Sequence, residues 1–250
     1  MSVPTSKPTA RAIAILPEGL RIYAVGDIHG RFDLLQQMAA AIVEDLRKAR
    51  PARILEIFLG DFIDRGPQSR EVVDWLIRTP PGGERVCLLG NHEDMLLKSL
   101  DDTDWMSNWL YNGAAETFVS YGVRTHGIGG SGLVDLQQGL RAVLPGSHLE
   151  FFAGLRRMFV FEPYVFVHAG IRPGRTLSEQ DPDDLVWIRE PFLQSKADFG
   201  FVVVHGHTPT ERPEVCPNRI NIDTGAVFTG RLTCLVLEGA TRRFLQVDSE

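Results

Sequence analysis

The sequence predicts an α/β layered fold built on a mixed β-sheet, and two patterns lead to this prediction. First, short apolar runs bounded by turn residues indicate buried strands. These runs are 21–25, 54–59, 85–89, 164–167, 201–204, 220–222 and 232–238. Second, helical patterns separate the early runs, which implies parallel pairing of their strands. The later runs follow one another closely, so we expect part of the sheet to be antiparallel.

The helical patterns are clearest in the first third of the chain. In 32–49 and in 69–78 the apolar residues recur at helical spacing. Ser69 is the expected N-cap of the second of these helices, with Glu71 near its first turn. Residues 93–160 are expected to be mostly helical as well.

No internal repeat or linker divides the chain. We expect a single domain over 20–250, preceded by a flexible leader at 1–19 that is rich in Pro and Thr. The apolar run of this leader, AIAIL, is too short for a signal peptide, and no stretch reaches the roughly 18 apolar residues of a membrane span. Three scattered cysteines without a CxxC pair favour a reducing compartment. The expected location is therefore cytoplasmic, with no membrane contact.

The composition is that of an ordinary globular protein, since 44% of the 250 residues are hydrophobic and 23% are charged. A chain of this length can bury a large core without staples. Its formal net charge of −6 provides no global positive field that would attract nucleic acid or an acidic membrane. Any reaction on phosphate groups would therefore need local positive charge.

Each of the first five apolar runs ends in a cluster of polar residues and glycine. The clusters are GDIHG at 26–30, GDFIDRGP at 60–67, GNHE at 90–93, HAG at 168–170 and HGHTP at 205–209. Ligand sites of α/β sheets form at the carboxyl ends of strands, where loops converge. The sequence therefore predicts that these clusters meet in one site.

The side chains of these clusters offer carboxylate, amide and imidazole donors but no thiolate, a set that suits Mn²⁺, Fe or Zn²⁺. Asp27 and His29 are two residues apart in extended chain, so they point the same way and can bind one cation together. Asp61 could bridge to a second cation. The remaining ligands of that second cation would be Asn91, His168 and His207. Two cations about 3.5–4 Å apart can clamp a phosphate group and lower the pKa of a shared water.

The order of these motifs resembles the metal-dependent phosphoprotein phosphatases of the serine/threonine type, in their bacterial and phage form, within the calcineurin-like metallophosphoesterases. The resemblance covers about residues 20–240. It implies an α/β fold with a two-layer mixed β-sandwich flanked by helices (αββα). It also implies a dinuclear site formed by the six ligands above. In the HGHTP motif, the resemblance makes His207 the metal ligand rather than His205. Mn²⁺ is the expected metal in both positions, with Fe or Zn²⁺ as alternatives.

The same resemblance implies roles for residues that do not bind metal. His92 matches the general acid that protonates the departing alkoxide, a contribution of about 10²–10⁴-fold in such reactions. Asp64 matches the carboxylate partner that orients the His92 ring. Arg65 and Arg189 match two guanidinium groups that bind phosphate beside Asn91. These arginines would supply the local positive charge that an acidic protein needs.

The resemblance favours hydrolysis of phosphoserine and phosphothreonine in proteins, extending to phosphotyrosine, by attack of metal-bound hydroxide. The expected partner is a phosphoprotein or phosphopeptide, met by a monomer or small homo-oligomer, with no nucleic acid. One alternative is a symmetrical dinucleoside tetraphosphate hydrolase, over which Asp64 and Glu93 favour the protein phosphatases. An alternative of another class is an inactive phosphate-binding scaffold, against which the complete set of ligands and the acid argue.

Structural roles compete with the functional ones at several positions. Arg65 and Asp64 could form a surface ion pair, and Arg189 could pair with a nearby acid. Those acids are Asp183, Asp184 and Glu190. Trp109 and Asn112 could either pack in the core or line the substrate site.

Other polar residues are expected to play supporting or unrelated roles. We expect His205 to pack behind the site and Asp223 to shape it from behind the ligands. His126 and His148 are expected at the surface, since both lie in polar loops. The three cysteines are expected to be packing residues.

Overall fold

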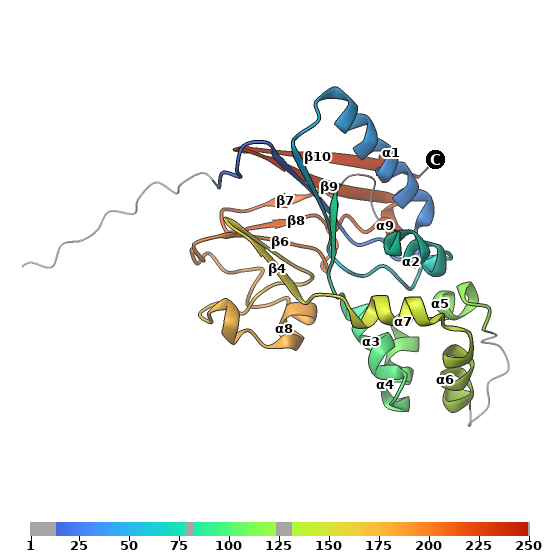
Figure 1. Ribbon diagram of the computed structural model, residues 1–250. Coiled ribbons are helices and arrows are strands. Elements are labelled where there is room, and N and C mark those ends of the chain that lie inside the picture. Colours follow the sequence, from blue (N-terminus) through green and yellow to red (C-terminus); the bar gives the residue numbers. More distant parts are fainter. Residues whose placement is uncertain (1–13, 79–82, 124–131, 250) are drawn as a thin grey trace, which may run out of the picture.

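The computed structural model describes residues 14–78, 83–123 and 132–249. Within these ranges the strands form two five-stranded mixed sheets that pack face to face, and helices flank them (Figure 1). The predicted two-layer mixed sandwich with flanking helices is therefore confirmed.

The first sheet has the strand order β10-β9-β1-β2-β3. Its strands are β1 (Leu20–Val25), β2 (Arg53–Phe58), β3 (Glu84–Cys87), β9 (Arg231–Glu238) and β10 (Thr241–Asp248). The first three pair in parallel, as the alternation of strand and helix predicts. β9 and β10 add to them antiparallel, so the predicted mixture of pairing is present. β10 was not predicted, because its polar residues outnumber its apolar ones.

The second sheet has the strand order β4-β5-β6-β8-β7. Its strands are β4 (Met158–Phe161), β5 (Tyr164–Val167), β6 (Val202–His205), β7 (Glu214–Val215) and β8 (Arg219–Asn221). Residues 158–160, which were expected to be helical, belong to β4. They are extended because they pair antiparallel with β5, with Phe159 opposite Phe166.

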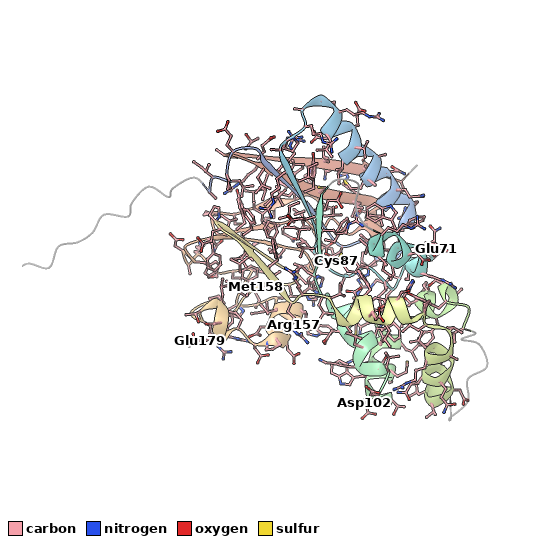
Figure 2. The ribbon with its side chains drawn as sticks, viewed as in Figure 1. Glu71, Cys87, Asp102, Arg157, Met158 and Glu179 are labelled. Carbon is pink, nitrogen blue, oxygen red and sulfur yellow. The ribbon has the colours of Figure 1, made fainter. Side chains whose placement is uncertain are left out.

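The helices lie outside the two sheets and at one end of them. They are α1 (Phe32–Lys48), α2 (Ser69–Ile77), α3 (Asn91–Ser99), α4 (Thr103–Tyr111), α5 (Ala115–Ser120), α6 (Gly132–Val143), α7 (Gly146–Ala153), η1 (Leu177–Glu179), α8 (Pro182–Trp187) and α9 (Ala226–Thr229). α1 covers β9 and β10, whereas α3 to α7 gather at the lower right of Figure 1. Asp102, the N-cap of α4, lies at the far edge of this helical group (Figure 2). Among the helices of the described residues, none is long and apolar enough to cross a membrane.

Alternation along the strands divides the core into layers. Ile22 and Ala24 of β1 belong to the core between the sheets, whereas Tyr23 and Val25 belong to the core under the helices of the first sheet. Val203 of β6 belongs to a third cluster on the outer side of the second sheet, which includes residues of α8. Packing on both faces fixes the strand ends from which the site loops depart.

Two residues in the described end of the predicted leader are packed. Ala14 and Leu16 are buried in the core between the sheets. The Leu16 N–H donates to the carbonyl oxygen of Gly239 at 2.9 Å. Ala14 and Leu16 therefore pack against the sheets, whereas Ile15, Pro17 and Glu18 between and after them are exposed. Residues 1–13 lie outside the described residues.

Candidate metal centre and active site

The site loops depart from ordinary backbone conformation. Among the described residues, those other than glycine with positive φ are all predicted site residues. They are His29 (47°), Asp61 (52°), Asp64 (73°), Arg65 (67°) and His207 (65°). A left-handed conformation costs an L-residue about 1–2 kcal/mol. Because these left-handed residues are all predicted site residues, the site loops hold a costly backbone conformation that orients their side chains.

Asp61 lies between two groups of buried donors. Within the part of the chain that the structure describes, His29, Asp61 and His92 form one group that could hold a cation, and Asp61, His168 and His207 form a second, while Asp27 belongs to neither group. Asp61 Oδ2 is 3.5 Å from His29 Nε2, and Asp61 Oδ1 is 3.3 Å from His168 Nε2. Asp61 thus faces both groups, as a bridging carboxylate must.

Asn91 and Asp27 complete the cluster of six predicted ligands. Asn91 Oδ1 lies 3.0 Å from His168 Nε2 and 2.8 Å from His207 Nδ1. Asp27 Oδ2 accepts from the backbone N–H of His207 at 3.0 Å, while Asp27 Oδ1 is buried and has no hydrogen-bond partner in the described residues. A buried carboxylate oxygen without a partner is costly. Hard oxygen donors grouped with imidazoles fit two divalent cations, which would satisfy this atom.

Two of the histidines are oriented as metal ligands usually are. His29 Nδ1 donates to the carbonyl oxygen of Ile63 at 2.9 Å, and His168 Nδ1 donates to that of Leu59 at 2.9 Å. A carbonyl oxygen only accepts, so each Nδ1 carries a proton and Nε2 is the atom left for a metal. In this structure His29 Nε2 accepts from Arg65 Nη1 at 2.8 Å. A backbone carbonyl that fixes the tautomer in this way is typical of metal-bound histidine.

The charges of the cluster favour cation binding. Burial, and then the charge of a neighbouring histidine, lowers the pKa of His29 to about 3 and that of His207 to about 2, so both rings are neutral. Burial also opposes charge on His168, but the carboxylate of Asp61 raises the pKa of His168 to about 10. Burial raises the pKa of Asp27, and a nearby carboxylate adds to this effect. A cation held by these carboxylates would replace the His168 proton, because imidazole binds metals only when neutral.

His92 is the third member of the first donor group, and the buried carboxylate of Asp64 engages its Nδ1. His92 Nδ1 is 2.6 Å from Asp64 Oδ2, while His92 Nε2 is buried, 3.9 Å from Asp61 Oδ2 and without a hydrogen-bond partner in the described residues. Burial lowers the pKa of His92, but the Asp61 and Asp64 carboxylates outweigh it and raise the pKa above its usual range. A protonated His92 can give its proton to a substrate oxygen.

Asp64 is completely buried, so it forms no surface ion pair with Arg65. It accepts a hydrogen bond from the indole of Trp109, which is itself buried and does not line the substrate cavity. The backbone N–H of Asp64 donates to Ser69 Oγ at 3.0 Å. The predicted capping role of Ser69 is wrong, because the N-cap of α2 is Gln68 and the Ser69 hydroxyl faces the Asp64 loop instead.

Glu93 anchors two of the site loops, a role that the sequence analysis missed. Its carboxylate accepts from the backbone N–H groups of Asp61 at 2.9 Å, Phe62 at 2.7 Å and Gly90 at 3.1 Å. The anchor holds the bridging carboxylate against the start of α3, which carries Asn91. A glutamate three residues after the N-cap is the spacing of a capping box, and this signal was available in the sequence.

A cavity of 280 Å³ opens beside the ligands. Its lining includes Arg65 and Arg189, together with Asn112, Trp187 and Phe228. No ion pair of Arg189 occurs within the described ranges. Two of the acids considered as its partners pair elsewhere, Asp183 with Lys98 and Asp184 with Arg172. Both arginines are therefore placed to bind an anion in this cavity.

His205 and Asp223 lie behind the ligands, as expected. The buried ring of His205 packs edge-on against Phe192, with centroids 5.1 Å apart, and does not belong to either donor group. Asp223 is buried and accepts from the backbone N–H of Gly225 at 2.9 Å, which shapes the loop after β8. Both residues support the site without facing the cavity.

His148 differs from its prediction. It is buried, with its Nδ1 2.7 Å from the Tyr121 hydroxyl and its Nε2 3.0 Å from Asp74 Oδ1. It links α7 to α2 and to the end of α5, a role that its polar sequence neighbours concealed. His126 lies outside the described residues.

Comparison with known proteins agrees with the geometry. The family model described as a calcineurin-like phosphoesterase matches residues 20–230. An asymmetrical bis(5'-nucleosyl)-tetraphosphatase PrpE of Anoxybacillus flavithermus is 30% identical over 84% of this chain and 88% of its own. A serine/threonine-protein phosphatase 1 of Salmonella typhimurium is 31% identical over 85% of this chain and 89% of its own.

A crystal structure of a putative diadenosine tetraphosphatase has the same fold, with a TM-score of 0.64 at 20% sequence identity. The match covers 92% of this chain and 94% of that one. The family model spans the second sheet, strands β1 to β3 of the first sheet and every loop that carries a predicted ligand. The chain therefore belongs to the calcineurin-like phosphoesterase family.

Proposed function

We propose that this chain hydrolyses dinucleoside tetraphosphates and cleaves them asymmetrically. The sequence analysis placed protein dephosphorylation first and a symmetrical tetraphosphatase second. The similarity to asymmetrical tetraphosphatases supports placing the dinucleotide first. Besides the Anoxybacillus enzyme, one from Halalkalibacterium halodurans is 26% identical over 84% of this chain. The chain is a phosphoesterase in either case.

The cavity carries the proposal at the level of residues. A polyphosphate chain needs more than one cationic group, and Arg65 and Arg189 line the same 280 Å³ cavity as the ligands. Aromatic rings for a nucleobase are present at its rim, since Trp187 lines the cavity and Phe228 is 68% exposed. The Arg65 guanidinium lies 5.6 Å from the centroid of the Phe228 ring, so the phosphate-binding and aromatic groups adjoin.

The reaction consumes one water and breaks one P–O bond. Two divalent cations, with Mn²⁺ expected, would polarise the phosphate and lower the pKa of the attacking water. Arg65 and Arg189 bind the oxygens of the attacked phosphate. His92 gives its Nε2 proton to the leaving oxygen as the bond breaks, and Asp64 stabilises the imidazolium before transfer. The water supplies the new oxygen on phosphorus, and its released proton passes to solvent, from which His92 is recharged.

Dephosphorylation of phosphoserine or phosphothreonine in proteins is the second candidate. The observation that favours it is the buried pair of His92 and Asp64. An alkoxide is a poor leaving group and needs a proton donor more than a departing phosphate does. The likeness to the Salmonella phosphatase points the same way.

The experiment offers diadenosine tetraphosphate and a phosphoserine peptide to Mn²⁺-loaded protein and measures kcat/KM for both. We expect faster turnover of the dinucleotide, with AMP and ATP as products by ion-exchange chromatography. Two molecules of ADP would indicate symmetrical cleavage, and a higher kcat/KM for the peptide would place the second candidate first. No turnover of either would favour the scaffold. Asp61→Asn is the inactive control. Arg189→Ala, which removes one of the two guanidinium groups of the cavity, should lower kcat/KM for the dinucleotide. Arg175→Ala is its matched control, since Arg175 is exposed and outside the cavity.

A further inference from the structure

The Asp64 carboxylate accepts hydrogen bonds from two other side chains besides His92. Asp64 Oδ2 accepts from His92 Nδ1 at 2.6 Å and also from Trp109 Nε1 at 2.5 Å. Asp64 Oδ1 accepts from Thr117 Oγ1 at 2.6 Å. All four residues are 0% exposed. Solvent therefore does not compete for any of these hydrogen bonds.

The chemistry of the donors fixes the direction of each bond. An indole N–H can only donate, so Asp64 Oδ2 must accept from Trp109. The Thr117 hydroxyl gives its proton to Asp64 Oδ1 and accepts from the Asp64 backbone N–H at 2.9 Å. Three short bonds to one carboxylate are charge-assisted. The carboxylate cannot rotate without breaking at least one of them, so the plane in which it meets His92 is set by Trp109 and Thr117.

These two donors come from the helical group and not from the sheets. Trp109 lies on α4 and Thr117 on α5. Trp109 packs against Phe118, with ring centroids 5.1 Å apart, so its indole has little freedom to turn. Asp64 lies in the loop after β2 with a φ of 73°, a conformation that needs support from its surroundings. The helices α4 and α5 thus supply part of the catalytic apparatus.

We propose that Trp109 and Thr117 are positioning residues that hold Asp64 and, through it, direct His92 Nε2 at the leaving oxygen. This inference rests on the proposed role of His92 as the acid. It follows that loss of either donor slows only those substrates whose leaving group needs the proton. A residue that merely stabilises the fold would affect all substrates alike.

The test compares two aryl phosphates that differ in leaving group, phenyl phosphate and 4-nitrophenyl phosphate, on Mn²⁺-loaded protein. In Trp109→Phe, which keeps the ring and removes the N–H, kcat for phenyl phosphate falls about tenfold, while kcat for the nitrophenyl ester stays within about twofold. KM is unchanged for both. Thr117→Val repeats the pattern, and Thr117→Ser, which keeps the hydroxyl, recovers most of the loss. Trp105→Phe is the matched control, because Trp105 lies on the same helix but faces Lys98.

The outcomes separate this inference from the proposed mechanism. An equal loss on both esters in Trp109→Phe overturns the positioning role. If His92→Asn itself shows no selective loss on phenyl phosphate, the acid assignment fails, and the inference fails with it. A readout independent of turnover is the downfield ¹H NMR signal of His92 Nδ1–H in metal-free protein. We expect this signal to move in Trp109→Phe and not in Trp105→Phe, and an unmoved signal contradicts the inference.

Discussion

Replacing Glu93 by Gln tests the anchor that joins two site loops. Glu93 Oε1 accepts from the N–H groups of Phe62 at 2.7 Å and Ile63 at 3.3 Å, and Oε2 accepts from those of Asp61 at 2.9 Å and Gly90 at 3.1 Å. Glutamine keeps one acceptor oxygen and turns an NH₂ group toward the other pair. Two buried N–H groups then lose their acceptor and face a donor, at about 1–3 kcal/mol each.

The expected loss of unfolding free energy in Glu93→Gln is therefore about 4 kcal/mol, a large fraction of the roughly 5–15 kcal/mol of a typical domain. Burial, and then repulsion by Asp61, raises the pKa of Glu93 to about 7, so removing its charge offsets some of this loss. For a chain of this size, about 4 kcal/mol lowers the melting temperature by roughly 8–16 °C.

Circular dichroism during heating of metal-free protein measures the Glu93→Gln effect. Glu116→Gln is the matched control, because Glu116 is exposed on α5 and its substitution should change the unfolding free energy by no more than about 0.5 kcal/mol. A melting temperature of Glu93→Gln within about 2 °C of the parent would refute the anchoring role. Activity should fall as well, since the backbone that carries Asp61 loses its support.

Three further predictions concern charge, thiols and metal. Burial raises the pKa of Asp45, but hydrogen bonds, led by that from Arg243, outweigh it and lower the pKa. Its stabilisation is present above the usual carboxyl pKa and is lost as the pH falls through the lowered one. Asp45→Asn should therefore cost about 3 kcal/mol in urea unfolding at pH 7 and progressively less as the pH falls below the usual carboxyl pKa, whereas a cost that does not change with pH would contradict this. Cys87 and Cys216 are both half-buried, but desolvation of its thiol raises the pKa of Cys87 to about 12. Iodoacetamide at pH 8 should therefore label Cys216 first, measured by mass spectrometry, and equally fast labelling of Cys87 would be the opposing result. Chelation should abolish hydrolysis, and added Mn²⁺ should restore it, with about two ions per chain by elemental analysis. The affinity for Mn²⁺ should rise with pH, because the His168 proton must leave before the ring can bind a metal. A single ion per chain would argue against Asp61 as a bridge.

The sequence was most informative where local patterns and tertiary structure agree. Strands β1, β2 and β5 are short apolar runs in both descriptions, because strands buried on both faces carry little else. The six expected ligands were chosen because the polar clusters follow strand ends, which a sheet brings together at one edge. Predicting them required no knowledge of side-chain packing.

The missed features depend on contacts between distant segments. β10 is amphipathic and is defined by its pairing with β9 rather than by its own residues. The bonds from Trp109 and Thr117 to Asp64 span 45 and 53 residues of sequence, and no spacing rule connects them. The partner of His148, Asp74, is 74 residues away in the sequence, so the burial of His148 could not be inferred locally.

The left-handed backbone at the site limits how freely the protein can evolve. Glycine at the position of Asp61 or Asp64 would adopt that conformation without penalty, but at Asp61 it would remove a metal donor. At Asp64 it would leave the buried donors of His92 and Trp109 without their acceptor. Relief of the backbone conformation therefore comes only with loss of the site's chemistry. Substitutions that adapt the site to a new substrate should be tolerated once stabilising substitutions have accumulated in the distant core.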